Sequence, residues 1–500
     1  MANIFVKKSL SKLLGEASAE GQGTLKRTLG AWNLVALGIG AIIGAGLFVR
    51  TASAAAQAAG PAVTMSFIVA AIGCAFAGLC YAEFAAMIPI AGSAYTYAYA
   101  TMGEIVAWVI GWALIMEYAL GAATVSIAWS EYLNKLLGGA IPFEWCHSPF
   151  ESATIAGVLH SGVINAPALV ILSLLTLILI KGTSESAKMN AVIVAIKLSI
   201  VLIFIVLGWS FIKDANHLPY MIPANQPDVL DASGKVLLSY GGFFKHGYGG
   251  VLGGAAIVFF AFIGFDAVST AAQEAKNPGK DMPIGILGSL AVCTILYVLF
   301  AHVLTGIAPW TDFADPVKGK EASVAYAISA YMPGYSWLAT GVTVAILAGF
   351  SSVILVMLMG QSRVFYSMSN DGLLPKVFSA LHPKFSTPYK SNIIVLIFVG
   401  IFAAFIPGSI AGDLTSFGTL LAFALVSIGV WIMRVSDPDA NRPFRTPLVP
   451  LVPILGAVIC LGMIVALDIV TLLSAVIWMV LGLVIYFAYS SKTSKLQKGE

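Results

Sequence analysis

A single lysine, Lys197, lies inside the apolar run from Ala191 to Leu207. A cation at the centre of a membrane helix costs roughly 2.5 to 3.5 kcal/mol on insertion scales, so its side chain must face a protein interior or a water-filled cavity. An ammonium group that can lose its proton there would act as a titratable switch, whereas a permanently charged one would bridge neighbouring helices. The first use predicts a transport mechanism, and the second a structural role.

Glycines interrupt the first apolar run of the chain. Gly38, Gly40, Gly44 and Gly46 fall close together, and each weakens a helix by about 1 kcal/mol relative to alanine. We expect the helix to break at residues 44–46. Unwound backbone is tolerated at membrane depth only where it lines a cavity, and its free amides favour an anion such as a carboxylate. Close helix packing is the alternative, because Gly40 and Gly44 also fit the GxxxG pattern.

A second apolar run carries a similar interruption, with Gly264 and Asp266 following the segment that begins at Phe259. Paired interruptions in the first helix of two halves are typical of inverted-repeat transporters. The spacing predicts two repeats of five spans each.

Two acids, Glu117 and Asp266, also lie at membrane depth. Intramembrane acids are functional candidates by default. They could pair with a cationic substrate, carry a proton or serve the structure, and Asp266 could instead cap the second half of its broken helix. Gly121, one turn beyond Glu117, could form the floor of a substrate pocket or pack against a neighbouring helix.

Charged residues at the span ends have less direct roles. We expect Glu83, Glu104 and Glu274 to pin loops or gates rather than to bind substrate. Arg50 and Glu131 lie near the opposite ends of their spans, where they could belong to an outer gate or be solvated at the membrane edge.

The composition requires a membrane setting for these residues. Hydrophobic residues make up 59% of the chain and charged residues only 10%, against about 25% charged in soluble domains. Apolar runs of about 18 residues or more recur, which predicts an all-α polytopic membrane protein. The expected spans are 31–57, 62–88, 105–133, 165–181, 190–212, 251–274, 284–308, 337–367, 392–406, 413–434, 450–468 and 472–489.

The basic residues predict the orientation. Most of the 27 Lys and Arg residues fall in segments that share one side of the membrane with residues 1–30, and such segments are cytoplasmic. We expect a cytoplasmic tail at 1–30, a transporter core at 31–435, two further helices at 436–490 and a cytoplasmic tail at 491–500. The net charge of +3 gives no reason to expect a nucleic-acid partner.

The nucleophiles and metal-binding residues of the chain are scattered. The five cysteines show no CxxC spacing, and the six histidines fall mostly in loops. No nucleophile-and-base set or metal cluster is apparent at membrane depth. We therefore expect neither an enzyme nor a cofactor or metal site.

Several motifs occur in a fixed order and resemble the amino acid-polyamine-organocation superfamily. They are Ile43–Phe48, Tyr81–Glu83, Pro89–Tyr95, Gly103-Glu104, Phe260–Asp266, Glu274–Pro278 and Gly360–Val364. Four further segments are similar to its cationic amino acid transporter branch: Gly111-Trp112, Glu117-Tyr118, Asn370–Pro375 and Arg442–Pro447. The resemblance covers roughly residues 24–490. It implies the LeuT-type fold, a five-plus-five inverted repeat with two added C-terminal helices and twelve transmembrane helices in all.

The resemblance also implies a substrate site. The unwound segment after Ile43 would hold the substrate carboxylate, and Phe260 would close over the substrate as an aromatic lid. The implied backbone amides are those of Gly44, Ala45 and Gly46, and the implied carbonyls for the α-ammonium group are those of Ile42, Phe260, Ala261 and Ile263. Many relatives carry Ser or Thr where Ala45 stands, so a hydroxyl contact is absent.

Lys197 matches the position where proton-coupled relatives place a lysine and sodium-coupled members of the fold bind an ion. The resemblance implies that its ammonium group replaces sodium and links span 1 near Gly44 to span 8 near Ser351 and Ser352.

These observations predict a secondary active amino acid transporter of the cell membrane. We expect it to be proton-coupled and sodium-independent, and to import cationic or small neutral L-amino acids by alternating access. Its expected partners are the amino acid, protons and the lipid bilayer. An exchanger or facilitator, or a sensor that binds the same ligand without moving it, is the alternative.

Overall fold

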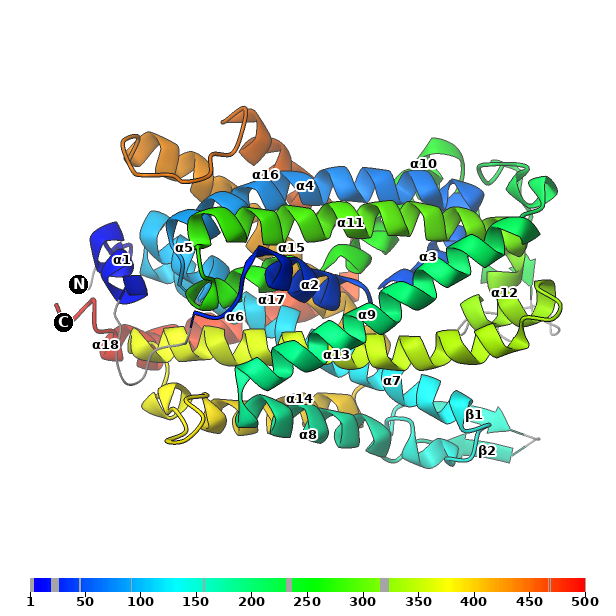
Figure 1. Cartoon of the computed structure of the whole chain (residues 1–500), viewed down its shortest axis with the longest axis horizontal. Helices are drawn as coiled ribbons and strands as arrows, with labels where there is room; N and C mark the ends of the chain where they lie inside the picture. Colours follow the sequence, from blue (N-terminus) through cyan, green and yellow to red (C-terminus); the bar gives the residue numbers. More distant parts are fainter. Residues whose placement is uncertain are drawn as a thin grey trace.

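Helices that run along one common direction build the molecule (Figure 1). The computed structural model describes residues 4–18, 27–44, 46–90, 92–155, 158–230, 236–314, 323–465, 467 and 469–499. Within this part of the chain, 8 helices are long and apolar enough to cross a membrane, and shorter apolar helices accompany them at 31–42, 166–181, 389–405 and 451–465. The expectation of a polytopic helical membrane protein is confirmed.

Each predicted span coincides with helical structure. The corresponding elements are α2 (Ala31–Ile42) with η1 (Gly46–Arg50), α3 (Thr51–Ala54) and η2 (Ala55–Ala59); α4 (Val63–Met87); α6 (Glu104–Ile115) with η4 (Met116–Leu120) and α7 (Gly121–Leu136); α8 (Ala166–Lys181); α9 (Thr183–Gly208); α10 (Gly247–Phe259) with η9 (Phe260–Phe262) and η10 (Asp266–Glu274); α11 (Pro278–Ile307); α13 (Ser336–Asn370); α14 (Tyr389–Phe405); α15 (Gly408–Ser436); α16 (Leu451–Val465); and α17 (Ile469–Ile485).

Shorter elements connect these helices. They are α1 (Leu10–Ser18), η3 (Gly60–Ala62), α5 (Ser93–Thr101), η5 (Phe143–Trp145), η6 (Trp209–Phe211), η7 (Asp214–His217), η8 (Phe243–Lys245), η11 (Trp310–Ala314), α12 (Ser323–Tyr331), η12 (Lys376–Ser379), η13 (Tyr486–Ser490) and α18 (Ser491–Thr493). Several long helices begin earlier than expected, and the differences are largest for α9, which begins at Thr183, and α11, which begins at Pro278. Their first turns are polar, so the apolar run alone does not mark the start of the helix.

Two small antiparallel hairpins were not predicted from the sequence. One pairs β1 (Ser152–Ile155) with β2 (Val158–Ser161), and the other pairs β3 (Val229–Leu230) with β4 (Val236–Leu238). The first hairpin lies at the end of the molecule opposite the two termini (Figure 1).

The long helices form two packed groups that meet at α2. In one group α11 packs along α4 and α2, and α10 packs against α4; in the other, α13 packs on α7, α9 and α14. Both α9 and α13 also contact α2. The share of the apolar window that is buried is 78% in α13 but 22% in the helix that begins at Ile469, so α13 is central and α17 faces outward.

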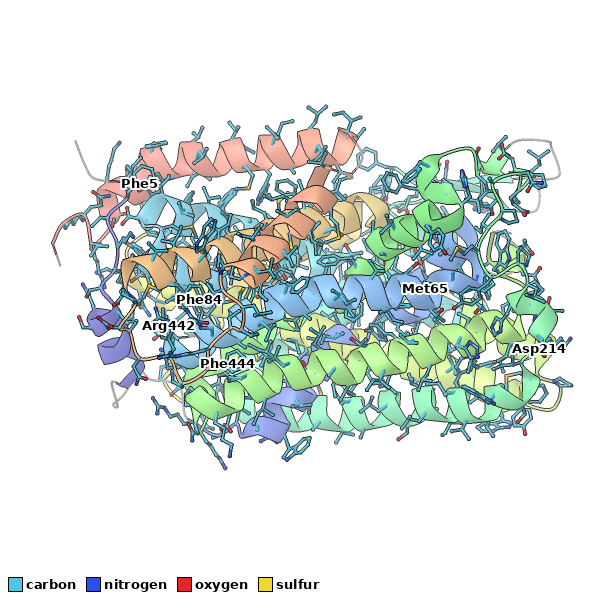
Figure 2. All side chains as sticks on the ribbon, turned by 90° about the horizontal axis from the view of Figure 1, so that it is seen from above. Phe5, Met65, Phe84, Asp214, Arg442 and Phe444 are labelled. Carbon is cyan, nitrogen blue, oxygen red and sulfur yellow. The ribbon has the colours of Figure 1, made fainter. Side chains whose placement is uncertain are left out.

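The two ends of the bundle carry different segments. Phe5, Arg442 and Phe444 lie at one end, and Asp214 lies at the other (Figure 2). The chain termini share the first of these ends (Figure 1). The separation agrees with the two sides that the distribution of basic residues predicts.

Candidate functional site

The first apolar helix breaks where its glycines predict. α2 ends at Ile42, the next residue has an extended backbone with ψ of 102°, and helical structure resumes at Gly46. Ala45 lies outside the described residues. The carbonyl groups in the last turn of a helix lack partners within the helix and carry the negative end of its dipole. The break therefore places hydrogen-bond acceptors inside the bundle.

Lys197 donates to this helix end. Its side chain is fully buried, and Nζ lies 2.8 Å from the Gly40 oxygen and 2.8 Å from the Ile43 oxygen. An ammonium group at the negative end of a helix dipole is favourable. The contact joins α9 directly to the broken end of α2.

The two serines expected near this lysine have different surroundings. Ser352 Oγ lies 3.1 Å from the same Gly40 oxygen and also bonds to Asn190 Oδ1. Ser351 instead donates to the Leu347 carbonyl of its own helix at 2.9 Å. The link from span 1 to span 8 therefore runs through Ser352 and the Gly40 carbonyl that it shares with Lys197. Asn190 also belongs to this hydrogen-bonded group and was not predicted from the sequence.

A third side chain, Tyr297 of α11, reaches both broken helices. Its hydroxyl oxygen lies 2.9 Å from the Ile42 oxygen and 2.9 Å from the Ala261 oxygen. Both carbonyls belong to the set expected to take the ammonium group of a substrate. Nothing in the sequence around this tyrosine distinguishes it from a packing residue.

The second break lies directly against the first. α10 ends at Phe259, and Gly264 adopts a φ of +116°, which favours glycine. A Cβ atom on Gly264 would lie 2.9 Å from the Ala41 side chain, and one on Gly46 would lie 2.2 Å from the Ala261 Cα. Because backbone meets backbone here, side chains at these glycines would separate the two breaks.

A small cavity lies between the breaks and the central helices. The residues that line it are Ala41, Ile42, Gly44, Gly46, Val125, Phe260, Ile263, Val353 and Met357. The walls away from the two breaks are apolar, from Val125, Val353 and Met357. Gly121 packs against Met357: a Cβ atom added to Gly121 would lie 2.8 Å from the Met357 sulfur.

Phe260 forms part of this lining, and the guanidinium carbon of Arg50 lies 5.2 Å from the centre of its ring. This distance is typical of a cation–π contact. The arrangement places Arg50 beside the aromatic residue expected to cover the substrate.

Glu117 and Asp266 lie together but do not line the cavity. Both are fully buried, Glu117 within the π-helical turn η4, and the Tyr118 hydroxyl donates to Asp266 Oδ2 at 2.5 Å. Glu117 lies against Asp266 and Thr419. Within the described part of the chain, both Glu117 oxygens and Asp266 Oδ1 lack a hydrogen-bond partner of acceptable geometry. Buried acceptors left open in this way are usually met by water, a proton or a cationic group.

A family model described as amino acid permease matches residues 29–486. The chain belongs to this family of transporters. The superfamily predicted from the motifs is thereby confirmed, as is the expectation that the protein is not an enzyme. Membership implies the LeuT-type fold.

Individual relatives of the permease match over most of their length. The chain is 41% identical over 498 residues to the branched-chain amino acid permease BcaP of Bacillus subtilis, and the match covers 99% of each chain. It is 40% identical over 500 residues to the methylthioribose transporter of the same bacterium, covering 100% of each. Cationic amino acid transporter 4 of Mus musculus is 34% identical over 447 residues, which are 87% of this chain and 64% of that protein.

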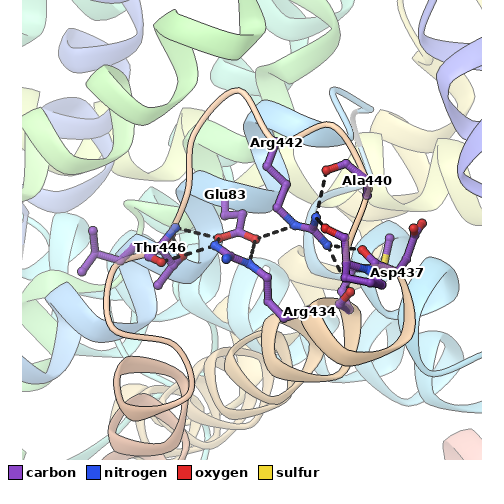
Figure 3. Close-up of polar contacts among 9 residues, drawn as sticks. Glu83, Arg434, Asp437, Ala440, Arg442 and Thr446 are labelled. Atoms are coloured by element: carbon purple, nitrogen blue, oxygen red, sulfur yellow. Dashed lines mark hydrogen bonds and ion pairs between the residues drawn. The ribbon is translucent and has the colours of Figure 1, made fainter.

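The permease carries a dense polar cluster at the end that holds the termini. Glu83 of α4 accepts from Arg434 Nη2 at 2.8 Å and from the Thr446 amide at 2.7 Å, and Arg442 Nε lies 3.2 Å away (Figure 3). These contacts fasten the segment after α15 to α4. The expectation that Glu83 pins a loop is confirmed.

Two other acids make comparable contacts. Glu274 of η10 forms a buried ion pair with Arg363 of α13. Glu104, at the start of α6, accepts from the hydroxyls of Tyr99 at 2.6 Å and Tyr486 at 2.9 Å. Both acids therefore join elements far apart in the sequence, as expected for residues that hold gates and loops.

The position of Glu117 gives a prediction about substrate charge. We expect Glu117→Gln to leave the affinity for an apolar amino acid within about threefold, under 1 kcal/mol, because Glu117 does not line the cavity. Any binding of lysine should fall by more than about tenfold, since a buried charge partner would be lost.

Competition binding at fixed pH measures both affinities. Asp214→Asn is the control, because Asp214 lies at the end of the molecule away from Phe5. Equal losses for leucine and lysine would contradict the prediction and assign Glu117 to the structure or to the proton.

Proposed function

We propose that this permease imports a neutral L-amino acid with an apolar side chain, such as leucine, isoleucine or valine, together with a proton. The apolar wall of this small cavity is the observation that carries the proposal. A branched aliphatic side chain against Val125, Val353 and Met357 removes apolar surface from water without burying a charge. The relative BcaP, named for branched-chain amino acids, supports the same class.

The backbone around the two breaks suits the rest of an amino acid. The amides of Gly44 and Gly46 would bind the carboxylate, because the first amides of a helical segment lack partners within the helix. The amides of Leu47 and Phe48 already donate to the Gly44 carbonyl. The carbonyls of Ile42, Phe260, Ala261 and Ile263 would receive the ammonium group. Gly44, Ala45 and Ile43 complete this proposed head-group site.

Cationic amino acids are the less supported alternative. Glu117 and Asp266, the acids proposed to meet a cationic side chain, lie outside the cavity lining. A lysine or arginine substrate would have to pass Gly121 and Met357 to reach them. The relatives named for cationic amino acids support this alternative at lower identity.

Lys197 is the proposed coupling group. Both of its acceptors are neutral carbonyls at the broken end of α2, so the bond strength depends on the charge of the ammonium group itself. Loss of the proton would weaken the hold of α9 on α2. In this proposal Ser352 shares the Gly40 carbonyl with Lys197 and Ser351 supports the same turn of α13, and sodium is not required.

The proposed architecture is a five-plus-five inverted repeat over residues 31–435, with α16 and α17 added at 436–490. The matched breaks in the first and sixth spans support it. The proposed location is the cell membrane, with the tails at 1–30 and 491–500 in the cytoplasm.

A thermal-shift screen of the purified protein tests the substrate class. We expect leucine, isoleucine and valine to raise the unfolding temperature more than lysine, arginine or alanine, since a ligand at 100 times its Kd stabilises the folded state by about 2.7 kcal/mol. Uptake of the best ligand into proteoliposomes, with a pH gradient and no sodium, then separates a transporter from a sensor.

Methylthioribose is included in the screen because a relative is named for it. Stabilisation by lysine and arginine alone, or by methylthioribose alone, would overturn the proposed substrate class. Binding without uptake would favour the sensor, and uptake by exchange without any response to the pH gradient would favour the exchanger.

A further inference from the structure

A second cleft lies between three helices, toward the end of the bundle that holds the chain termini. It is formed by the end of α8, the start of α14 and the C-terminal part of α13. α13 ends at Asn370, and the next residue, Asp371, pairs with Lys8 of the N-terminal segment at 2.6 Å. The lining includes the apolar residues Leu179, Met359, Leu381 and Pro388 and the polar residues Arg363 and Asn392.

Arg363 brings a buried positive charge to this cleft. Its side chain is only 5% exposed, and its Nη2 atom pairs with Glu274 of η10. Among the described residues, its Nη1 atom has no hydrogen-bond partner. A guanidinium group carries five N–H donors, and a buried donor without an acceptor is unfavourable. The cleft therefore contains a charged donor whose hydrogen bonds an anion can complete.

Exposed lysines flank the segments that line the cleft. Lys181 is the last residue of α8, Lys384 lies in the segment that leads into α14, and Lys390 lies in the first turn of α14. These segments are held together, because Thr387 Oγ1 lies 2.8 Å from the Ile180 oxygen. No acidic residue is among the described residues that line the cleft. The charged groups around it are therefore positive.

The helices that form this cleft also face outward. α8 and α14 pack together at one edge of the molecule (Figure 1). Leu174 and Leu177 of α8 and Ile393 and Ile397 of α14 are between 43% and 59% exposed, as expected for side chains that contact acyl chains. Farther from the termini, a second hollow between the same two helices is lined by residues that include Leu169, Leu396 and Gly400. A lipid beside these helices can thus place its acyl chains along them and its headgroup near the lysines.

We propose that the cleft binds the headgroup of an anionic phospholipid such as phosphatidylglycerol. The phosphate accepts hydrogen bonds from Nη1 of Arg363, and the three exposed lysines attract its negative charge. Because the same guanidinium group pairs with Glu274, a bound headgroup also holds the ion pair between η10 and α13 in place. None of these residues lines the cavity between the breaks, so the lipid site does not depend on which substrate the permease carries.

Native mass spectrometry of the purified full-length protein tests this site. Titration with phosphatidylglycerol and with phosphatidylcholine of the same acyl chains gives a Kd for each lipid. We expect wild type to prefer phosphatidylglycerol by about tenfold or more, because the choline group of the second lipid brings a positive charge to the lysines. The triple variant Lys181→Gln, Lys384→Gln, Lys390→Gln should lose most of this preference.

A second triple variant is the matched control. Lys276→Gln, Lys280→Gln and Lys492→Gln remove the same number of charges from exposed lysines in other segments, and we expect the wild-type ratio of the two Kd values. Arg363→Lys tests the inner part of the cleft, because an ammonium group can still pair with Glu274 but lacks the guanidinium fork. We expect its affinity for phosphatidylglycerol to fall by about threefold or more. If this variant does not fold, the two lysine variants still decide the test.

Several outcomes would overturn the proposed lipid site. Equal affinity of wild type for the two lipids would do so, as would equal losses in the two triple variants. Unchanged affinity in Arg363→Lys would place the headgroup on the surface lysines rather than in the cleft. Inorganic phosphate is titrated against bound phosphatidylglycerol to separate the two sources of a phosphate group. Displacement of the lipid by millimolar phosphate would assign the cleft to a free oxyanion instead.

Discussion

The Lys197→Ala permease is expected to lose pH-gradient-driven accumulation of its amino acid while retaining weaker binding. The change removes two bonds from a charged donor to the broken end of α2. Even one such bond is worth about 1.5 to 3 kcal/mol, so accumulation should fall by at least about tenfold. Labelled substrate trapped in proteoliposomes under an imposed pH gradient is the measurement.

Lys280→Ala is the control, because Lys280 is exposed at the start of α11 and far from the break in sequence. Accumulation by Lys197→Ala at the wild-type level would exclude the coupling role. A requirement for sodium in the wild-type protein would count equally against it, since the ammonium group should already fill the place of the ion.

The Gly46→Val permease is expected to lose detectable binding of every amino acid. A Cβ atom at this position would lie 2.2 Å from the Ala261 Cα, where backbone cannot move aside as a side chain can. Valine also adds a branched side chain that restricts the unwound conformation. The two breaks would separate and the proposed head-group site would open. Equilibrium binding to the purified variant is the measurement.

A graded series separates this effect from general misfolding. A Cβ on Gly44 would meet Val353 Cγ2 at 2.7 Å, a side-chain atom that can rotate, whereas nothing lies within 4 Å at Gly462 in α16. We therefore expect binding to fall most in Gly46→Val, less in Gly44→Val and not at all in Gly462→Val. Normal binding by Gly46→Val would place the carboxylate site elsewhere.

Much of the fold follows from patterns that the sequence displays directly. The span expected at 62–88 is α4, Val63–Met87, because lipid requires a continuous apolar helix of about that length. The break expected at residues 44–46 falls between Ile42 and Gly46, because clustered glycines weaken a helix wherever they occur. Local composition decides both features.

The side chains that contact the two broken helices depend on how each neighbouring helix is rotated, and they could not be predicted from local composition. Ser351 and Ser352 are adjacent, so they point about 100° apart, and only the packing of α13 against α2 brings Ser352 to the Gly40 carbonyl. Tyr297 stands in an apolar run where an aromatic residue usually serves packing alone. Glu117 lies in a π-helical turn, whose extra residue changes the direction of every side chain that follows.

The Glu104 cluster has a consequence for biosynthesis. This buried carboxylate also accepts from Ser494 Oγ and from Gln497 Nε2, the latter at 3.2 Å, and Ser494 lies 390 positions further along the chain. A ribosome that has delivered Glu104 must add nearly all of the later helices before these partners emerge. Until then, lipid headgroups or water must supply the hydrogen bonds that Ser494 and Gln497 provide in the folded protein. The hydrogen bonds from Ser494 and Gln497 therefore form late, and they distinguish the fully assembled bundle from a chain that is still being inserted into the membrane.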